Sequence, residues 1–277
     1  MGVARSGLFA VASVLLFIFL LAGNLFLTLK TSLTYENVEP EVASVVEKLA
    51  DEFNLTEDVN NKMPTMTTYC QNNSEYVFSQ DGRVFVIPCD VVVQGNNAVV
   101  DYGIKSIIKD AYYEKYECDF WNCFKENEPP FFLVSEKAKD YWSEKFYFTL
   151  LALIILIILM FFLIKEKTNL PIVVGILLAL ASLPFIKLNW LFSFMPNNPF
   201  FEFISVLVSN SYNIFLASII LGLIILTIGI ILKFFKIGFK ISEFFSKKDA
   251  TSKEEVKEIV KSEISKSKIP VSKKKSK

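Results

Sequence analysis

Four cysteines are the residues of this chain with the clearest capacity for chemistry. Two of them, Cys118 and Cys123, enclose Phe120 and Trp121 in the stretch YECDFWNCF. Four thiols can bind zinc, form a redox-active dithiol or close two disulfides. The four are Cys70, Cys89, Cys118 and Cys123, and all lie between residues 30 and 145.

Disulfides account for these cysteines better than zinc or redox catalysis. Zinc ligands usually come in pairs about two to four residues apart, whereas these cysteines are widely spread and the chain has no histidine. A reactive dithiol usually has the spacing Cys-x-x-Cys, and here the acidic neighbours Glu117 and Asp119 disfavour a thiolate. Of three pairings, we favour Cys70 with Cys89 and Cys118 with Cys123, because both close local loops.

Disulfides require an oxidising compartment, so the position of a membrane matters, and the composition indicates a membrane protein. The chain has 277 residues, of which 52% are hydrophobic, and a mean hydropathy of +0.41. A helix that spans a bilayer needs about 17 to 25 mostly apolar residues. Four stretches predict such helices: residues 7–29, 146–164, 170–186 and 203–232.

The first stretch has two interpretations. Arg5 before an apolar run, with small residues near Asn24, also fits a cleaved secretory signal peptide. However, the apolar run continues to Leu29, which exceeds the roughly 7 to 15 residues of a signal core. We expect residues 1–29 to form the N-terminus and a retained anchor, whereas cleavage near Asn24 would leave three spans.

Basic residues that flank the spans predict the orientation. Arg5, the link at 165–167 and the lysines after residue 232 lie on the same side of the four stretches. We therefore expect a multi-pass protein of the cell membrane, with both termini cytoplasmic and residues 30–145 extracytoplasmic.

The two sides of the membrane are expected to carry opposite charge. The outward segment has 11 Lys/Arg and 21 Asp/Glu, a net charge of minus 10. Residues 233–277 have 14 Lys and 6 Asp/Glu, a net charge of plus 8.

The outward segment is long enough for one small, disulfide-stapled α+β domain between the first two spans. The pattern predicts an amphipathic helix at 37–54 and a hairpin at 74–90 around Asp81-Gly82. We expect Phe120 and Trp121 to pack on the hairpin. Further expected features are strands at 90–94 and 98–103, a helix at 104–116, and glycosylation acceptors at Asn54 and Asn72.

Small residues and prolines organise the later spans. Gly175 with Ala179, and Ser218 with Gly222, have the spacing that lets helices approach closely within one bundle. Residues 187–202 are rich in aromatic residues and contain Pro-Asn-Asn-Pro, which predicts an outer loop at the membrane interface.

After the last span, residues 233–248 predict a basic amphipathic helix at the membrane surface. Phenylalanines and isoleucines form one face and lysines the other, which favours contact with anionic lipids of the inner leaflet. Residues 249–277 form a basic cytoplasmic tail with a short helical pattern. The expected lipid-interface residues are Lys233, Lys236, Lys240, Lys247 and Lys248.

No residue pattern indicates catalysis, a cofactor or nucleic-acid binding. Without histidine the chain cannot form a Ser-His-Asp triad, and no phosphate-binding glycine pattern is present. The leading hypothesis is a non-enzymatic scaffold, assembly or receptor-like subunit. It would bind a protein through its outward domain or tail helix, or form a homo-oligomer. The alternatives are a channel or transporter component and an extracytoplasmic thiol-disulfide oxidoreductase.

Overall fold

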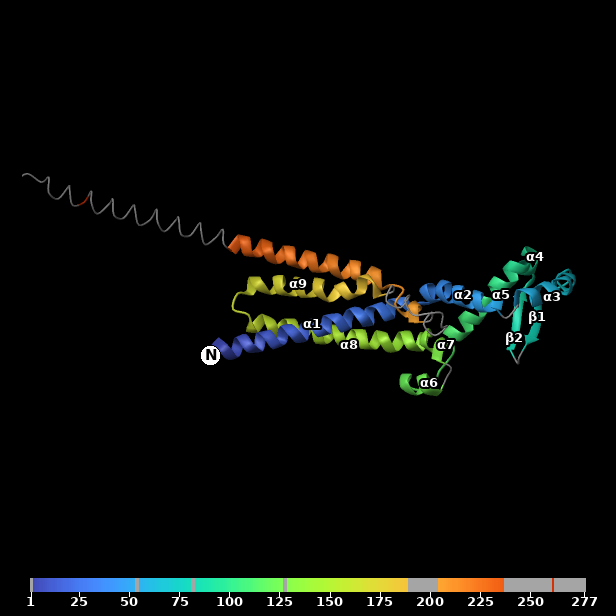
Figure 1. Ribbon diagram of the computed structural model, residues 1–277, viewed down its shortest axis with the longest axis horizontal. Coiled ribbons are helices and arrows are strands. Elements are labelled where there is room, and N and C mark those ends of the chain that lie inside the picture. The colour runs from blue at the N-terminus through green and yellow to red at the C-terminus, as the bar shows by residue number, and fades with distance from the viewer. Residues whose placement is uncertain are drawn as a thin grey trace, which may run out of the picture.

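The protein is a mostly helical, elongated molecule with a helix bundle at one end and a small domain at the other (Figure 1). The computed structural model describes residues 2–52, 55–80, 83–126, 129–188, 204–236 and residue 261. The bundle contains the first helix and the last three long helices of this part of the chain. The small domain is formed by the elements between the first and the second of these helices in sequence.

Among the described residues, four helices are long and apolar enough to cross a membrane, which agrees with the predicted number. They are α1 (Gly2–Ser32), α8 (Glu136–Leu163), α9 (Leu170–Ser182) with the 3₁₀ turns Lys167–Asn169 and Leu183–Ile186 at its ends, and Ile204–Lys236, here called the fourth span. Because α8 begins ten residues before the predicted start at residue 146, it extends about 15 Å beyond its apolar part.

The fourth span crosses α9 at a contact between glycines. A Cβ atom added to Gly175 would lie 2.7 Å from the carbonyl oxygen of Gly222, and one added to Gly222 would lie 3.1 Å from the backbone nitrogen of Ala179. No side chain fits in such a gap, so the two backbones touch directly. The prediction that these small residues pack within one bundle is confirmed.

Polar side chains join α1 to the fourth span. The hydroxyl of Ser218 donates to Asn24 Oδ1 at 2.8 Å, and both side chains are buried. Nearer the small domain, the backbone nitrogen of Asn210 donates to Ser32 Oγ at 3.1 Å. Hydrogen bonds between spans are favourable because lipid offers no alternative partner. α1 also packs along α8 and α9, so it is the central helix of the bundle.

Basic side chains satisfy the carbonyl groups at the C-terminus of α8. The Arg5 guanidinium donates to the carbonyl oxygens of Phe162, Leu163 and Ile164 at 2.9, 2.6 and 3.2 Å. Lys167 Nζ donates to the carbonyl oxygen of Phe161 at 2.7 Å. The last carbonyls of a helix have no partners within the helix and carry partial negative charge, so these cations stabilise the helix end.

The described residues of the small domain form six helices and one hairpin. Its inner layer is α2 and α5, which lie side by side, and the hairpin with α3 and α4 lies at the end farthest from the bundle (Figure 1). The elements are α2 (Tyr35–Glu52), α3 (Leu55–Tyr69), β1 (Glu75–Gln80), β2 (Arg83–Pro88), α4 (Cys89–Gln94), α5 (Asn96–Tyr112), α6 (Phe120–Glu126) and α7 (Pro129–Leu133).

The predicted hairpin register is confirmed. β1 pairs antiparallel with β2, with Tyr76 opposite Ile87 and Phe78 opposite Phe85. Ile87 is buried in a small cluster with Met66 of α3, and Tyr76 packs against the same cluster. The inner face of the hairpin therefore holds α3, α4 and the start of α5 together. The turn residues Asp81 and Gly82 lie outside the described residues.

The prediction of two further strands at 90–94 and 98–103 is wrong, because these residues form α4 and the first part of α5. A short valine-rich run fits a strand or a buried helix equally well, and tertiary packing decides between them. Here Val92 and Val99 are buried in the cluster below the hairpin. Gly95, with a φ of +105°, lets the chain turn between the two helices at an angle that favours glycine. Only the hairpin makes the domain α+β.

Replacing Gly175 with alanine is expected to destabilise the bundle. The new methyl group would collide with the backbone of the fourth span, and such overpacking costs about 1 to 3 kcal/mol. The midpoint of thermal unfolding of the detergent-solubilised protein measures the effect. Gly7→Ala is the matched control, because no atom lies within 4 Å of its added Cβ. An equal midpoint for the two variants would contradict the close crossing.

Candidate functional site

The small domain and the bundle share one hydrophobic core, which we call the juxtamembrane core. It collects residues from the end of α1, from α2 and α5 to α8, and from the start of the fourth span. A shared core of this kind prevents the domain from moving independently of the spans. Its buried members include Leu33, Val38, Val42, Ile108, Tyr112, Phe120, Cys123, Phe132, Val134, Ala138 and Val206.

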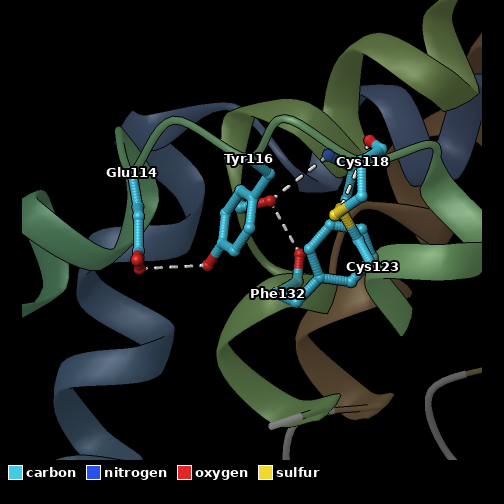
Figure 2. The surroundings of a disulfide bond; sticks show 7 residues. Glu114, Tyr116, Cys118, Cys123 and Phe132 are labelled. Atoms are coloured by element: carbon cyan, nitrogen blue, oxygen red, sulfur yellow. Dashed lines mark hydrogen bonds between the residues drawn. A yellow bond between two sulfur atoms is a disulfide. The ribbon is translucent and has the colours of Figure 1, made fainter. Parts of the chain in front are cut away.

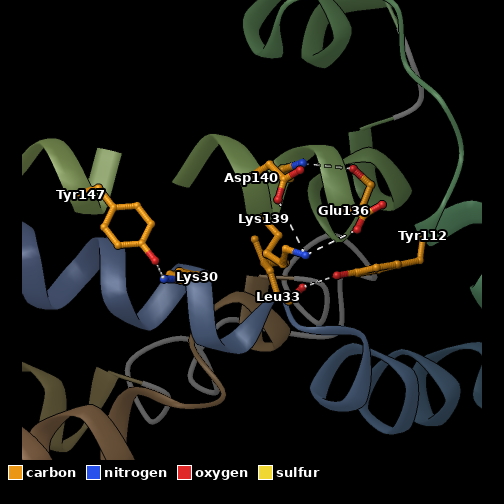
Figure 3. Close-up of polar contacts among 9 residues, drawn as sticks. Lys30, Leu33, Tyr112, Glu136, Lys139, Asp140 and Tyr147 are labelled. Atoms are coloured by element: carbon orange, nitrogen blue, oxygen red, sulfur yellow. Dashed lines mark hydrogen bonds and ion pairs between the residues drawn. The ribbon is translucent and has the colours of Figure 1, made fainter. Parts of the chain in front are cut away.

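The junction between α1 and α2 is held by α5. The buried hydroxyl of Tyr112, at the end of α5, donates to the carbonyl oxygen of Leu33 at 2.8 Å (Figure 3). The side-chain amide of Asn37 donates to the carbonyl oxygen of Thr31 at 2.7 Å. The Tyr35 ring packs edge-on against Tyr112, with centroids 5.3 Å apart. These contacts fix the direction in which α2 leaves the membrane-spanning helix.

Aromatic rings join α6 to the outer end of α8. Phe120 stacks on Tyr141 with centroids 4.1 Å apart, and it also lies 5.6 Å from the Trp142 ring. Trp142 in turn stacks on Phe26 of α1 at 5.8 Å. The expectation that Phe120 and Trp121 pack on the hairpin is wrong. Phe120 is buried in the juxtamembrane core, and Trp121 is 57% exposed, because α8 extends outward far enough to supply a nearer aromatic surface.

The cysteines occur as two disulfides, paired as the loop lengths favoured. Cys118–Cys123 has a Cα–Cα distance of 5.4 Å and closes the start of α6, with Cys123 fully buried. Figure 2 shows it beside Phe132, whose ring centroid is 5.1 Å from that of Tyr116. Cys70–Cys89, at 5.3 Å, joins the end of α3 to the start of α4. Burial within a packed core is typical of a structural disulfide.

Burial and neighbouring acids raise the pKa values of the tyrosines at the domain junction. Burial, with Glu136 nearby, raises the pKa of Tyr112 well above its ordinary value. Burial and a hydrogen bond with Glu39 raise the pKa of Tyr35 to about 12. Glu136 itself pairs with Lys139 at 3.6 Å (Figure 3). Tyr112 therefore remains a protonated hydrogen-bond donor at neutral pH.

The hairpin has a second, unpacked face, which we call the hairpin outer face. It consists of Val77, Val84 and Val86, which point away from the cluster below the hairpin and are 55%, 67% and 42% exposed. Val77 and Val86 are directly opposite each other in the pair of strands. The three valines form a contiguous apolar patch, and such patches, unlike single exposed apolar residues, can serve as contact sites for another molecule.

Other predicted site residues lie at the surface. Asn72 is exposed in the bend between α3 and β1, where a glycan would have room, and Asn54 lies outside the described residues. Lys233 and Lys236 are exposed at the end of the fourth span. Lys240, Lys247 and Lys248 lie outside the described residues. Among the described residues, no three His, Cys, Asp or Glu side chains are grouped to hold a metal ion.

The juxtamembrane core and the hairpin outer face were both missed by sequence reasoning. The signal for the core was the aromatic pair Tyr141 and Trp142, which lies just before the predicted second span. The signal for the outer face was the alternation of valines within the hairpin itself. A strand whose residues are apolar on both faces indicates that both faces have contacts.

Replacing Tyr112 with phenylalanine is expected to lower the free energy of unfolding by about 1 to 3 kcal/mol, because the buried Leu33 carbonyl loses its donor. The difference in the free energy of unfolding between the wild-type protein and Tyr112→Phe should depend on pH. The unfolded chain ionises near pH 10, the ordinary tyrosine value, before the folded one does. Stabilisation by the protonated hydroxyl is thus complete below pH 10 and declines as pH rises further.

Chemical unfolding of both proteins between pH 7 and pH 11 tests this expectation. The wild-type protein should lose more stability than Tyr112→Phe over the alkaline part of that range. Tyr113→Phe serves as the control, since the Tyr113 ring is nearly half exposed. Parallel pH profiles for all three proteins would show that Tyr112 does not secure the junction.

Removing each disulfide by paired alanine substitution is expected to destabilise the protein unequally. Cys70–Cys89 spans 19 positions and Cys118–Cys123 spans 5. Loop entropy alone therefore predicts that removal of Cys70–Cys89 lowers the free energy of unfolding by about 1 kcal/mol more than removal of Cys118–Cys123. Unfolding midpoints of the C70A/C89A and C118A/C123A variants measure it. Loss of thiol-disulfide exchange activity in C118A/C123A, with stability unchanged, would instead favour an oxidoreductase.

Comparison with protein-family models, with curated proteins and with solved structures found no match. The function is therefore inferred from the geometry of the described residues. The features that bear on it are the juxtamembrane core, the hairpin outer face and the two closed cysteine pairs.

Proposed function

We propose that the protein is a non-enzymatic scaffold, assembly or receptor-like subunit of the cell membrane, whose outward domain binds a partner protein. The observation that carries this proposal is the hairpin outer face. Its three valines are exposed at the end of the molecule farthest from the bundle, where a partner has free access (Figure 1). Lipid does not cover them at that distance, so a protein surface is the partner that fits their chemistry.

The orientation in this proposal has both termini in the cytoplasm and residues 30–145 outside. Its support is the distribution of basic residues at the two ends of the bundle. Arg5 and Lys167 both bind the C-terminal end of α8, and the fourth span ends beside them with Lys233 and Lys236 (Figure 1). The opposite end has three flanking lysines, Lys145, Lys187 and Lys30, of which Lys30 donates to the Tyr147 hydroxyl at 3.0 Å. The greater number of basic residues at the first end favours a cytoplasmic location.

The juxtamembrane core would give the outward domain its receptor-like character. A partner bound at the hairpin is connected through α5 to Tyr112, and through Tyr112 to the end of α1. Phe120 provides a second connection, through α6 to α8. A domain packed in this way transmits a displacement to the spans or holds them in one arrangement, whereas a domain on a flexible linker does neither.

The alternatives receive less support from the described residues. Both cysteine pairs are closed and Cys123 is buried, which disfavours redox exchange. Most buried polar side chains of the described spans bond to protein: Ser218 donates to Asn24 Oδ1 and Thr28 to the Asn24 carbonyl oxygen, although Asn24 Nδ2 has no partner among the described residues. That arrangement is typical of helix packing and does not indicate a path for a solute.

Substitution of the hairpin outer face is expected to weaken partner binding without unfolding the domain. Val84→Glu places a charge on the hairpin outer face. In the complex, the partner would no longer bury a valine side chain at this position, which costs about 1.5 kcal/mol and lowers the affinity roughly tenfold. The measurement is the yield of each protein crosslinked to this chain in native membranes. The crosslinking reagent does not cross the bilayer, and mass spectrometry identifies the products.

Val93→Glu on α4 is the matched control, because Val93 is 77% exposed and lies outside the hairpin. Intact disulfides, mapped by non-reducing mass spectrometry, show that each variant is folded. The proposal fails if the same proteins are crosslinked to wild type and Val84→Glu in equal yield, or if the reagent captures no partner at all.

A further inference from the structure

The short helix α6 has one buried face and one exposed aromatic residue. Phe120 and Cys123 are buried in the juxtamembrane core at 5% and 0% exposure. Trp121, between them in sequence, is 57% exposed. A tryptophan is rarely left in water, because its large ring is apolar and its one polar group is a single N–H donor. This position is therefore expected to meet something other than bulk solvent.

The contacts of α6 place Trp121 at the level of the lipid headgroups. Phe120 stacks on Tyr141, which precedes the first residue of the apolar run, Phe146, by five residues. At 1.5 Å per residue, Tyr141 is about 7.5 Å outside the hydrocarbon boundary. The headgroup layer on each side of a bilayer is about 5 to 8 Å thick. Lys145, with its Nζ 5.0 Å from the Tyr141 ring centroid, marks the same level.

The exposed surface of α8 leads directly to this level. Tyr147, Phe148 and Leu151 are each more than half exposed at the outer end of the apolar run, where lipid is expected to cover them. Figure 1 shows α6 beside the outer end of the same helix. Trp121 is thus close to a surface that is already expected to be covered by lipid.

We propose that α6 is a membrane-surface anchor, in which Trp121 inserts into the headgroup layer of the leaflet next to the small domain. The lipid surface that fits is zwitterionic. The exposed charged residues around α6 are three acids, Glu114, Glu117 and Asp119, and two bases, Lys115 and Lys125, so the segment has a net charge of minus 1 and no basic excess that would attract an anionic surface. The anchor is independent of the partner-binding role proposed above, since it requires only that α8 spans the bilayer.

The Cys118–Cys123 disulfide gives this anchor its shape. A helix of seven residues is not stable by itself in water. The disulfide closes the chain around Phe120 and Trp121, and the buried Cys123 fixes the helix face that points to the core. Reduction is therefore expected to release Trp121 from its position, which links the second disulfide to membrane contact.

Fluorescence quenching of the full-length protein tests the proposal. The chain has three tryptophans, so W142F/W190F leaves Trp121 as the single emitter, and W121F/W190F leaves Trp142 as the matched control. Each protein is reconstituted in phosphatidylcholine vesicles that carry a nitroxide quencher either at the headgroup or deep in the acyl chain. Aqueous iodide is the third quencher.

Trp121 is expected to be quenched at least twofold more by the headgroup nitroxide than by the deep one, and weakly by iodide. Reducing agent should increase iodide quenching of Trp121 more than that of Trp142. Strong iodide quenching with no lipid quenching in oxidised protein would overturn the proposal. So would protection from iodide in native membranes but not in vesicles, because a protein would then cover Trp121. The hairpin crosslinking result does not affect either outcome.

Discussion

The hydrogen bond from the Tyr112 hydroxyl to the Leu33 carbonyl is the buried polar contact within the core that connects the two ends of this molecule. It lies where a membrane-spanning helix ends and the chain changes direction, so a backbone carbonyl there has lost its helical partner. Burial makes an unsatisfied carbonyl costly, and burial also raises the pKa of Tyr112, which keeps the donor protonated. The same burial therefore creates the need for the contact and maintains it.

Around that contact, the protein combines two kinds of packing. Within the bundle, α9 and the fourth span touch through glycine backbones, and α1 joins the fourth span through Asn24 and Ser218. These are the means available in lipid, where apolar burial does not drive helices together. Outside the bundle, large rings such as Phe120 and Tyr141 fill a water-excluding core. α8 participates in both, since its apolar part is long enough to cross a bilayer and its first turns belong to the core.

The surfaces left exposed fit the proposed role. The hairpin outer face is exposed at the end of the small domain away from the bundle, whereas Trp121 is exposed beside α8. The segment 30–145 that contains both has a net charge of minus 10. A protein partner at one end and a zwitterionic lipid surface at the other would hold the domain in a defined orientation. The juxtamembrane core would then pass that orientation to α1 and α8.

The sequence by itself determined the features that depend on local pattern. Long apolar runs have no alternative to a helix in lipid, so the four spans were predictable. An Asp-Gly turn between alternating strands defined the hairpin register, and short loops favoured the two disulfide pairs. Only tertiary structure decided that residues 90–103 are helical, because a short valine run has no preference until its neighbours are in place. It also decided where Phe120 and Trp121 lie, since that depends on how far α8 extends beyond the membrane, which hydropathy alone does not reveal.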